Sequence, residues 1–188
     1  MTLKVFLVLI NYLMIMPQSE ETNMKSKIAD FTDKNVREKW DITNDDVMGG
    51  FSSSKISIGE NDVLVFSGNV SLENNGGFAS LRSPIDDYDF SDYEGFLLKI
   101  KGDGKTYNLS FRSTKYFTGY NYTQKFPTEK DKWQTINLPF NDFKLKYYGR
   151  EVTDSELPDK SNIKQLSILI SDKQQGPFKI EIAWIGLY

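Results

Sequence analysis

The chain has 188 residues, a length typical of one domain that can bury a hydrophobic core. Its formal net charge is −3 and it has no long basic run, which argues against nucleic acid as a partner because phosphate binding needs a positive surface. The absence of histidine and cysteine excludes the usual serine and cysteine nucleophile systems, zinc, iron and copper sites with those ligands, and disulfides. Any catalysis would need carboxylates, lysine, tyrosine or a metal held by oxygen ligands.

The N-terminal 17 residues are predicted to be an apolar leader separate from the domain. Lys4 precedes an apolar run of about a dozen residues, which is too short to span a bilayer and matches the core of a signal peptide. No small-residue cleavage site follows, and an N-terminal strand is the alternative. A signal peptide would place the protein outside the cytoplasm or in the cell envelope; otherwise we expect a cytoplasmic protein. Residues 18–27 are polar and are expected to form a linker.

Residues 28–188 are expected to form one all-β domain. Turn residues recur at short intervals, and apolar residues alternate with polar ones between them, as in a sandwich of antiparallel sheets. We expect region 141–164 to be irregular, with at most one helical turn. The last strand should bury Phe178, Ile180, Ile182 and Trp184 on one face. The expected strands cover residues 54–58, 63–66, 78–82, 96–101, 106–113, 120–126, 133–138, 166–170 and 178–184.

Residues 40–50 are predicted to form a structured loop, because polar and apolar positions do not alternate there. Trp40 is expected to anchor the loop, with Val47 and Met48 helping to hold it. The polar residues have two interpretations: they bind a ligand or a calcium ion, or they cap local turns, as Asn and Asp often do. These polar residues are Asn44, Asp45 and Asp46.

A second loop rich in asparagine and glycine, residues 74–78, repeats this pattern. If the two loops pack together, their glycine pairs permit a close approach of the two backbones. We then expect side chains to bond backbone groups across the junction, and the loss of one such bond to cost about 1–3 kcal/mol. The side chains concerned are Asn44, Asp45, Asn74 and Asn75.

Three expected strands each have one face made of polar residues or tyrosines. If these faces lie on one sheet, they form a concave polar surface with aromatic platforms, suited to binding. The alternative is the ordinary solvent face of an antiparallel sheet. The residues on these faces are Asn108, Ser110 and Arg112 on one strand, Ser80 and Arg82 on another, and Tyr120 and Tyr122 on a third.

Several motifs occur along the chain in a fixed order: Trp40, residues 44–50, 66–68, 71–80 and 102–104, Tyr107, Trp133, and residues 138–140 and 176–178. Together they resemble the complex I intermediate-associated protein family, over about residues 28–188. The chain departs from the family pattern at Phe51, where the family usually has an arginine after the glycine pair.

This resemblance implies a galactose-binding-like jelly-roll β-sandwich of two antiparallel sheets, with no catalytic residues and no cofactor. It implies a non-enzymatic protein that assists assembly of a membrane-associated, complex I-like assembly by binding a subunit or assembly intermediate. The alternative is a carbohydrate-binding module of the same fold, with a glycan as its ligand. The candidate binding residues are Asn44, Asp45, Asp46, Asn74, Asn75, Arg82, Asn108, Arg112, Tyr120 and Tyr122.

Overall fold

The computed structural model describes residues 23–188. The predicted leader, the export expectation that depends on it and the first five residues of the predicted linker lie outside this range. Within it, Ser26 and Lys27 belong to a strand and not to a linker, because they pair with the C-terminal strand of the domain. Their polar side chains had suggested a linker. No helix within residues 23–188 is long and apolar enough to cross a membrane.

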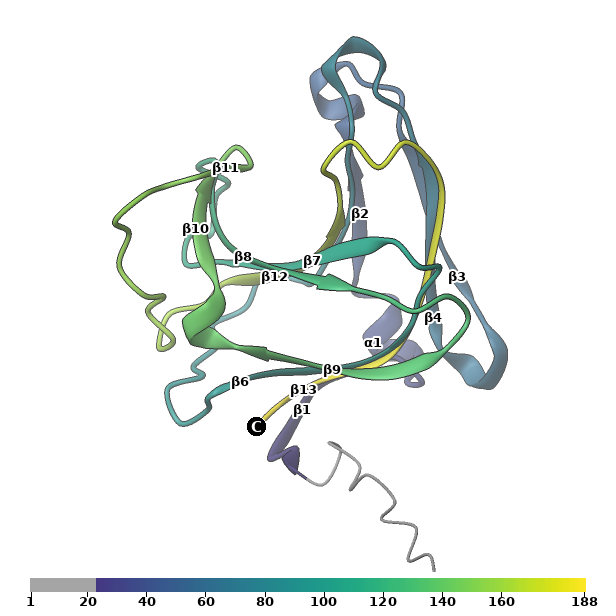
Figure 1. Ribbon diagram of the computed structural model, residues 1–188. Helices are drawn as coiled ribbons and strands as arrows, with labels where there is room; N and C mark the ends of the chain where they lie inside the picture. The colour runs from purple at the N-terminus through teal and green to yellow at the C-terminus, as the bar shows by residue number, and fades with distance from the viewer. Residues whose placement is uncertain (1–22) are drawn as a thin grey trace, which may run out of the picture.

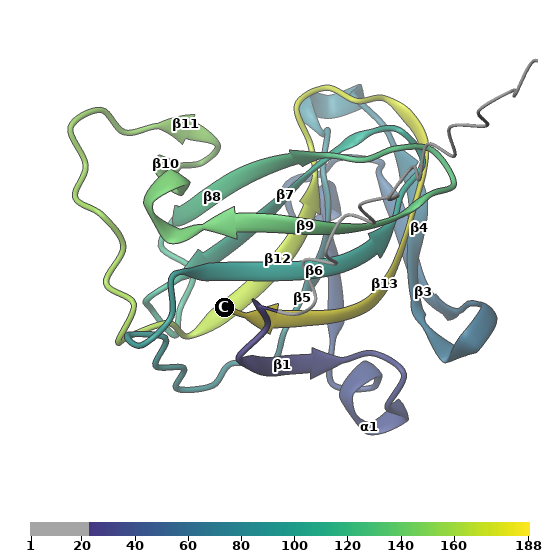
Figure 2. The ribbon, with the colours of Figure 1, turned by 60° about the horizontal axis from the view of Figure 1, so that its bottom comes forward.

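The domain is a sandwich of two antiparallel β-sheets, as predicted. One sheet has the order β3-β4-β13-β6-β9, with β1 also paired to β13, and Figure 2 shows β9, β6, β13 and β1 side by side. The other has the order β11-β10-β8-β7-β12-β5-β2. The elements are β1 Ser26–Asp30, α1 Lys34–Arg37, β2 Asp41–Asn44, β3 Ser53–Ile58, β4 Leu64–Val70, β5 Ala79–Arg82, β6 Gly95–Lys101, β7 Thr106–Arg112, β8 Tyr120–Pro127, β9 Trp133–Pro139, β10 Lys144–Tyr147, β11 Arg150–Glu151, β12 Gln165–Ile170 and β13 Gly176–Leu187.

The hydrophobic core lies between the two sheets and is rich in aromatic rings. Phe96 of β6 packs edge-on against Phe140, with 4.9 Å between ring centroids. Such pairs stabilise a core beyond the apolar surface that they bury. Trp40 is buried and packs edge-on against Phe31 at 5.0 Å, which confirms its predicted role as an anchor.

A β-bulge in β13 changes which residues face the core. Phe178, Ile180 and Ile182 are buried as predicted, but the pairing with β6 shifts register between Ile182 and Trp184. A bulge adds one residue to a strand and so reverses the alternation beyond it. Trp184 is therefore only half-buried and Ile185 takes the core position, so the prediction for Trp184 was wrong.

Region 141–164 is only partly irregular: the predicted helical turn is present as the 3₁₀ turn Phe140–Asp142, but the prediction missed two short strands, β10 and β11. β10 pairs with β8 and forms a hairpin with β11 around Tyr148 and Gly149. Both turn residues have positive φ, of 44° and 78°, as a tight two-residue hairpin requires. In Figure 1 the hairpin stands at one side of β8, β7 and β12, while β2 stands at the other. The seven-stranded sheet is thereby curved around its outer face.

Candidate functional site

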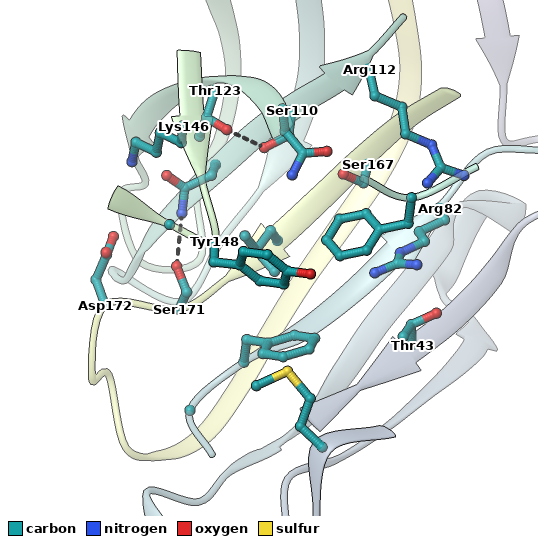
Figure 3. A pocket seen from close by; sticks show the side chains of 18 of the residues that line it. Thr43, Arg82, Ser110, Arg112, Thr123, Lys146, Tyr148, Ser167, Ser171 and Asp172 are labelled. Atoms are coloured by element: carbon teal, nitrogen blue, oxygen red, sulfur yellow. Dashed lines mark hydrogen bonds between the residues drawn. The ribbon is translucent and has the colours of Figure 1, made fainter. Parts of the chain in front are cut away.

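The outer, concave face of the seven-stranded sheet holds a cavity of about 570 Å³. Its floor is formed by β7, β12 and β5, one wall by the β10–β11 hairpin, and the other by β2 with the two asparagine- and glycine-rich loops. Volumes of this size are typical of ligand sites. Figure 3 shows side chains from all these elements converging on the cavity.

The strand alternation of β7 supplies the polar floor. Tyr107, Leu109 and Phe111 are buried in the core, and their neighbours Asn108 and Ser110 line the cavity on the opposite face. The prediction that this face is concave and polar is confirmed in geometry, although it is more buried than an ordinary solvent face.

Polar atoms on this floor are only partly satisfied. Ser110 shares a hydrogen bond of 2.9 Å with Thr123, and the Asn108 amide donates to Ser171 Oγ at 3.3 Å. The Asn108 Oδ1 atom is buried and has no hydrogen-bond partner among the described residues. Buried acceptors are nearly always paired, so this oxygen is available to a donor on a ligand.

Two arginines occupy the other end of the floor. Arg82 of β5 and Arg112 of β7 lie on the two strands that flank β12, and both line the cavity. Burial, followed by the charge of Arg112, lowers the pKa of Arg82, and burial lowers the pKa of Arg112. Each guanidinium carbon lies 6.0 Å from the centre of the Phe117 ring, a distance at which the ring face attracts a cation.

Asp45, by contrast, is a structural residue that joins the two loops. Its side chain is fully buried, with 0% exposed, and accepts bonds from Ser52 N, Ser52 Oγ, Gly77 N and Phe78 N at 2.5–3.2 Å. Burial raises the pKa of the carboxyl, but these hydrogen bonds outweigh it and leave the pKa below its usual value. The capping interpretation therefore fits Asp45, and direct ligand contact does not.

The remaining loop residues differ in what they bond. Asn74 donates to the Gly49 carbonyl at 3.2 Å, a bond across the loop junction as predicted, whereas Asn44 accepts from the Ser54 hydroxyl and not from backbone. Among the described residues, the Asp46 side chain accepts a bond only from the N–H of its neighbour Val47. Asn75 lines the cavity but makes no side-chain hydrogen bond with the described residues, so its predicted bond was wrong. Its backbone is left-handed instead, with φ 59°.

Val47 and Met48 do not hold the loop in place, contrary to prediction. They lie on a 3₁₀ turn, Asp45–Met48, whose buried member is Asp45, and both side chains are exposed at the edge of the cavity. Since Asp45 and Trp40 fix the loop, these two apolar side chains are free to face a ligand or partner.

The two tyrosines predicted as platforms do not line the cavity. Tyr122 faces the core and stacks on Phe111, with 5.5 Å between centroids, and Tyr120 packs against Tyr147 at 4.6 Å. The alternation of β8 instead turns Asn121 and Thr123 toward the cavity, and the prediction for Tyr120 and Tyr122 was wrong.

Two aromatic residues that reach the cavity were missed. Tyr148 sits on the β10–β11 turn, and Phe117 lies on the loop between β7 and β8; the two rings meet edge-on at 5.8 Å. The signal for Tyr148 was the Tyr147-Tyr148-Gly149-Arg150 stretch after an alternating segment, which is typical of a hairpin. Phe117 gave only a weak signal, an aromatic residue in a polar loop.

Comparison with known proteins identifies the family. The family model of complex I intermediate-associated protein 30 matches residues 29–182. The chain belongs to this family. Its mouse relative "Complex I intermediate-associated protein 30, mitochondrial" is 28% identical over 84% of this chain and 54% of that protein, and the Drosophila melanogaster relative is 24% identical over 85% and 62%. This family member thus spans little more than half the length of those relatives.

Solved structures support the fold assignment of this family member. A family 11 carbohydrate-binding module from a Clostridium thermocellum cellulase has a TM-score of 0.64, with 17% identity over 87% of this chain and 94% of that one. At this identity the likeness shows a common β-sandwich fold and nothing about ligands. Chemically, the site offers cations, amides and hydroxyls for binding. Residues 23–188 contain no group of three acidic side chains that could hold a metal.

Proposed function

We propose that this protein is a non-enzymatic assembly factor that binds a protein partner, a subunit or intermediate of a membrane-associated, complex I-like assembly. Family membership and the names of the mouse and fly relatives support the process. The lack of histidine and cysteine supports a binding role over catalysis.

The apolar edge of the cavity is the observation that carries the proposal. Met48 is 63% exposed and Val47 69% exposed, and both lie on a loop that buried Asp45 holds rigidly. Phe51, 61% exposed, follows on the same loop. Ordered, exposed apolar side chains beside a cavity are typical of protein interaction sites. The neighbouring wall adds Tyr148, an aromatic residue of the kind that is common at interfaces.

Affinity capture from the source organism tests this proposal. Tagged protein should retain subunits of the respiratory complex, identified by mass spectrometry. Met48→Asp should reduce their recovery at least tenfold, because a charge replaces an apolar contact. Ile58→Asp is the matched control, since Ile58 is 60% exposed on the other sheet and outside the cavity. Absence of respiratory subunits from the wild-type sample, or equal loss in both variants, would contradict the proposal.

Glycan binding is a second candidate, favoured by the hydroxyl and amide groups on the cavity floor. One solved structure with a TM-score of 0.56 is described in complex with a mixed-linked β-1,3-1,4 tetrasaccharide. Titration with that tetrasaccharide tests this candidate directly. Saturable binding that is lost in Asn108→Ala would favour the glycan, and an absence of heat or chemical-shift change would exclude this sugar.

A further inference from the structure

Two arginines of this protein are equally buried but differ in how many hydrogen-bond acceptors surround them. Arg37 and Arg112 each expose 8% of their surface. Arg37 donates to the carbonyls of Phe31 at 2.7 Å and Thr32 at 2.9 Å, and also to that of Asp62, which fits a structural role. Arg112 donates only to Lys115 O, at 3.2 Å, and its buried Nε has no partner among residues 23–188. A buried cation without a hydrogen-bond acceptor destabilises the folded protein. The Nε of Arg112 therefore needs an acceptor from a bound molecule, because the described residues do not supply one.

Arg82 is the second half of this cationic site. Its Nε donates to Ser80 Oγ at 3.0 Å, and neither Arg82 nor Arg112 forms an ion pair within residues 23–188. In register, Arg82 lies opposite Ser167 and Arg112 opposite Gln165, on the two sides of β12. The strand spacing therefore separates the two backbones by roughly 10 Å, a span that two long side chains close from both sides. Figure 3 shows both side chains reaching into the same end of the cavity.

The charges around the cavity are unbalanced. Its described lining contains four cations and one carboxylate: Arg82, Arg112, Lys146 and Arg150 against Asp172. Asp172 already pairs with Lys125 at 3.0 Å and lies across the cavity from the two arginines in Figure 3. A positive cavity in a chain of net charge −3 concentrates anions locally.

We propose that Arg82 and Arg112 bind the carboxylate of an acidic side chain carried by an extended segment of the partner protein. The inference rests on the proposed function, because it takes the occupant to be a protein. A carboxylate offers two oxygens in a plane and matches the planar guanidinium groups, which form their strongest hydrogen bonds with such anions. It also neutralises the repulsion between the two arginines.

The surroundings of the arginines favour a peptide over an acidic sugar. Phe117 is occupied by the two cations and meets Tyr148 at 89°, so the two rings form no flat platform for a sugar ring. Val47 and Met48 at the edge fit the apolar side chains that flank an acidic residue in a protein segment. On the floor, the unpaired Asn108 Oδ1 can accept a backbone N–H of that segment.

Titration of the full chain with small probes, followed by NMR of the arginine Nε–H signals, tests the site without the natural partner. The main probe is the capped tripeptide leucine–glutamate–leucine, and its glutamine counterpart is the matched neutral control. Capped peptides, glucuronate and inorganic phosphate are each added to the wild type, Arg82→Gln, Arg112→Gln and Lys55→Gln. Lys55 is exposed on β3, so Lys55→Gln removes one positive charge outside the cavity.

We expect the glutamate peptide to shift the signals of both arginines and to bind at least tenfold more tightly than the glutamine peptide, glucuronate or phosphate. Arg82→Gln and Arg112→Gln should each weaken it at least tenfold, whereas Lys55→Gln should not. Arg112→Lys keeps the charge but loses the planar guanidinium group. Its affinity for the glutamate peptide should lie between those of the wild type and Arg112→Gln. Thermal unfolding of each variant separates loss of binding from loss of fold.

Other outcomes overturn the inference. Preference for glucuronate would assign the site to an acidic glycan, and equal binding of phosphate would make it a general anion site. Equal affinity for the glutamate and glutamine peptides would show that the site does not recognise a carboxylate. If these probes fail while affinity capture still recovers respiratory subunits, the carboxylate site is wrong and the proposed function stands. If capture fails while the peptide binds selectively, the proposed function is wrong and the carboxylate site stands.

Discussion

The Asp45 carboxylate accepts a hydrogen bond from the Gly77 amide at 2.5 Å and so joins two loops that lie 32 residues apart in the chain. Gly76 packs against the same carboxylate so closely that a Cβ atom there would lie 2.6 Å from Oδ2. Gly50 approaches it from the first loop. One glycine of each pair, Gly50 and Gly76, thus permits the close approach of backbone to a buried charge, and this junction fixes the edge of the cavity.

The first prediction concerns the junction. Asp45→Ala should lower the free energy of unfolding by about 3 kcal/mol, because it leaves buried N–H groups unpaired and removes hydrogen bonds to a charge. Asp46→Ala is the matched control and should change it by less than about 0.5 kcal/mol, since within residues 23–188 the Asp46 carboxylate accepts a bond only from the adjacent Val47 N–H. Denaturant unfolding measures both, and equal losses in the two variants would contradict this role for Asp45.

The second prediction is a pH dependence. The pKa of Asp45 is lowered in the folded protein, so its carboxylate stabilises the fold at pH values above the unfolded pKa of about 3.9. That contribution is lost as the pH falls through the lower folded pKa. The difference in unfolding free energy between the wild type and Asp45→Asn should therefore be constant from pH 7 to about 5 and shrink toward pH 3. Glu181, whose pKa is also lowered, is present in both proteins and cancels. A difference that grows in acid would refute the assignment.

The third prediction separates backbone strain from hydrogen bonding at Asn75. Its φ of 59° is tolerated by asparagine and glycine but costs alanine roughly 1 kcal/mol. Asn75→Ala should therefore lose about 1 kcal/mol of unfolding free energy, whereas Asn75→Gly should lose almost none. Comparable losses in both variants would show instead that a side-chain bond is broken.

The fourth prediction concerns Tyr148, an aromatic residue held at φ 44°. This conformation costs a side chain roughly 1–2 kcal/mol, which ring contacts with Phe117 and Tyr147 offset. Tyr148→Asn should thus change stability by less than about 1 kcal/mol, because asparagine tolerates this turn position. Recovery of respiratory subunits in affinity capture should nevertheless fall at least tenfold. Tyr116→Asn, an exposed tyrosine outside the cavity lining, should leave recovery unchanged.

Alternation and turn residues were sufficient to predict the sandwich and the polar floor. The apolar positions of β7 must face the core, which leaves Asn108, Ser110 and Arg112 on the opposite face. The same reasoning failed for β8, because both faces carry residues that suit either side. There the packing of Tyr122 on Phe111 decided the orientation.

Other features depend on contacts distant in sequence. The bulge that turns Trp184 out of the core arises from pairing with β6, and nothing in the local pattern marks it. Val47 and Met48 appeared to be loop anchors because apolar residues are usually buried. They are exposed because Asp45, through its bonds from Ser52 and Gly77, holds the loop instead.

Site-specific photo-crosslinking tests most directly the claim that the cavity binds a protein partner. Benzoylphenylalanine would replace Tyr148 at the cavity or, as control, Trp133, a partly exposed aromatic residue on β9 of the other sheet. After illumination in cells of the source organism, mass spectrometry identifies the adducts. We predict that position 148 crosslinks to a subunit of the complex I-like assembly and that position 133 does not. Adducts with such a subunit from position 133 alone would contradict the account.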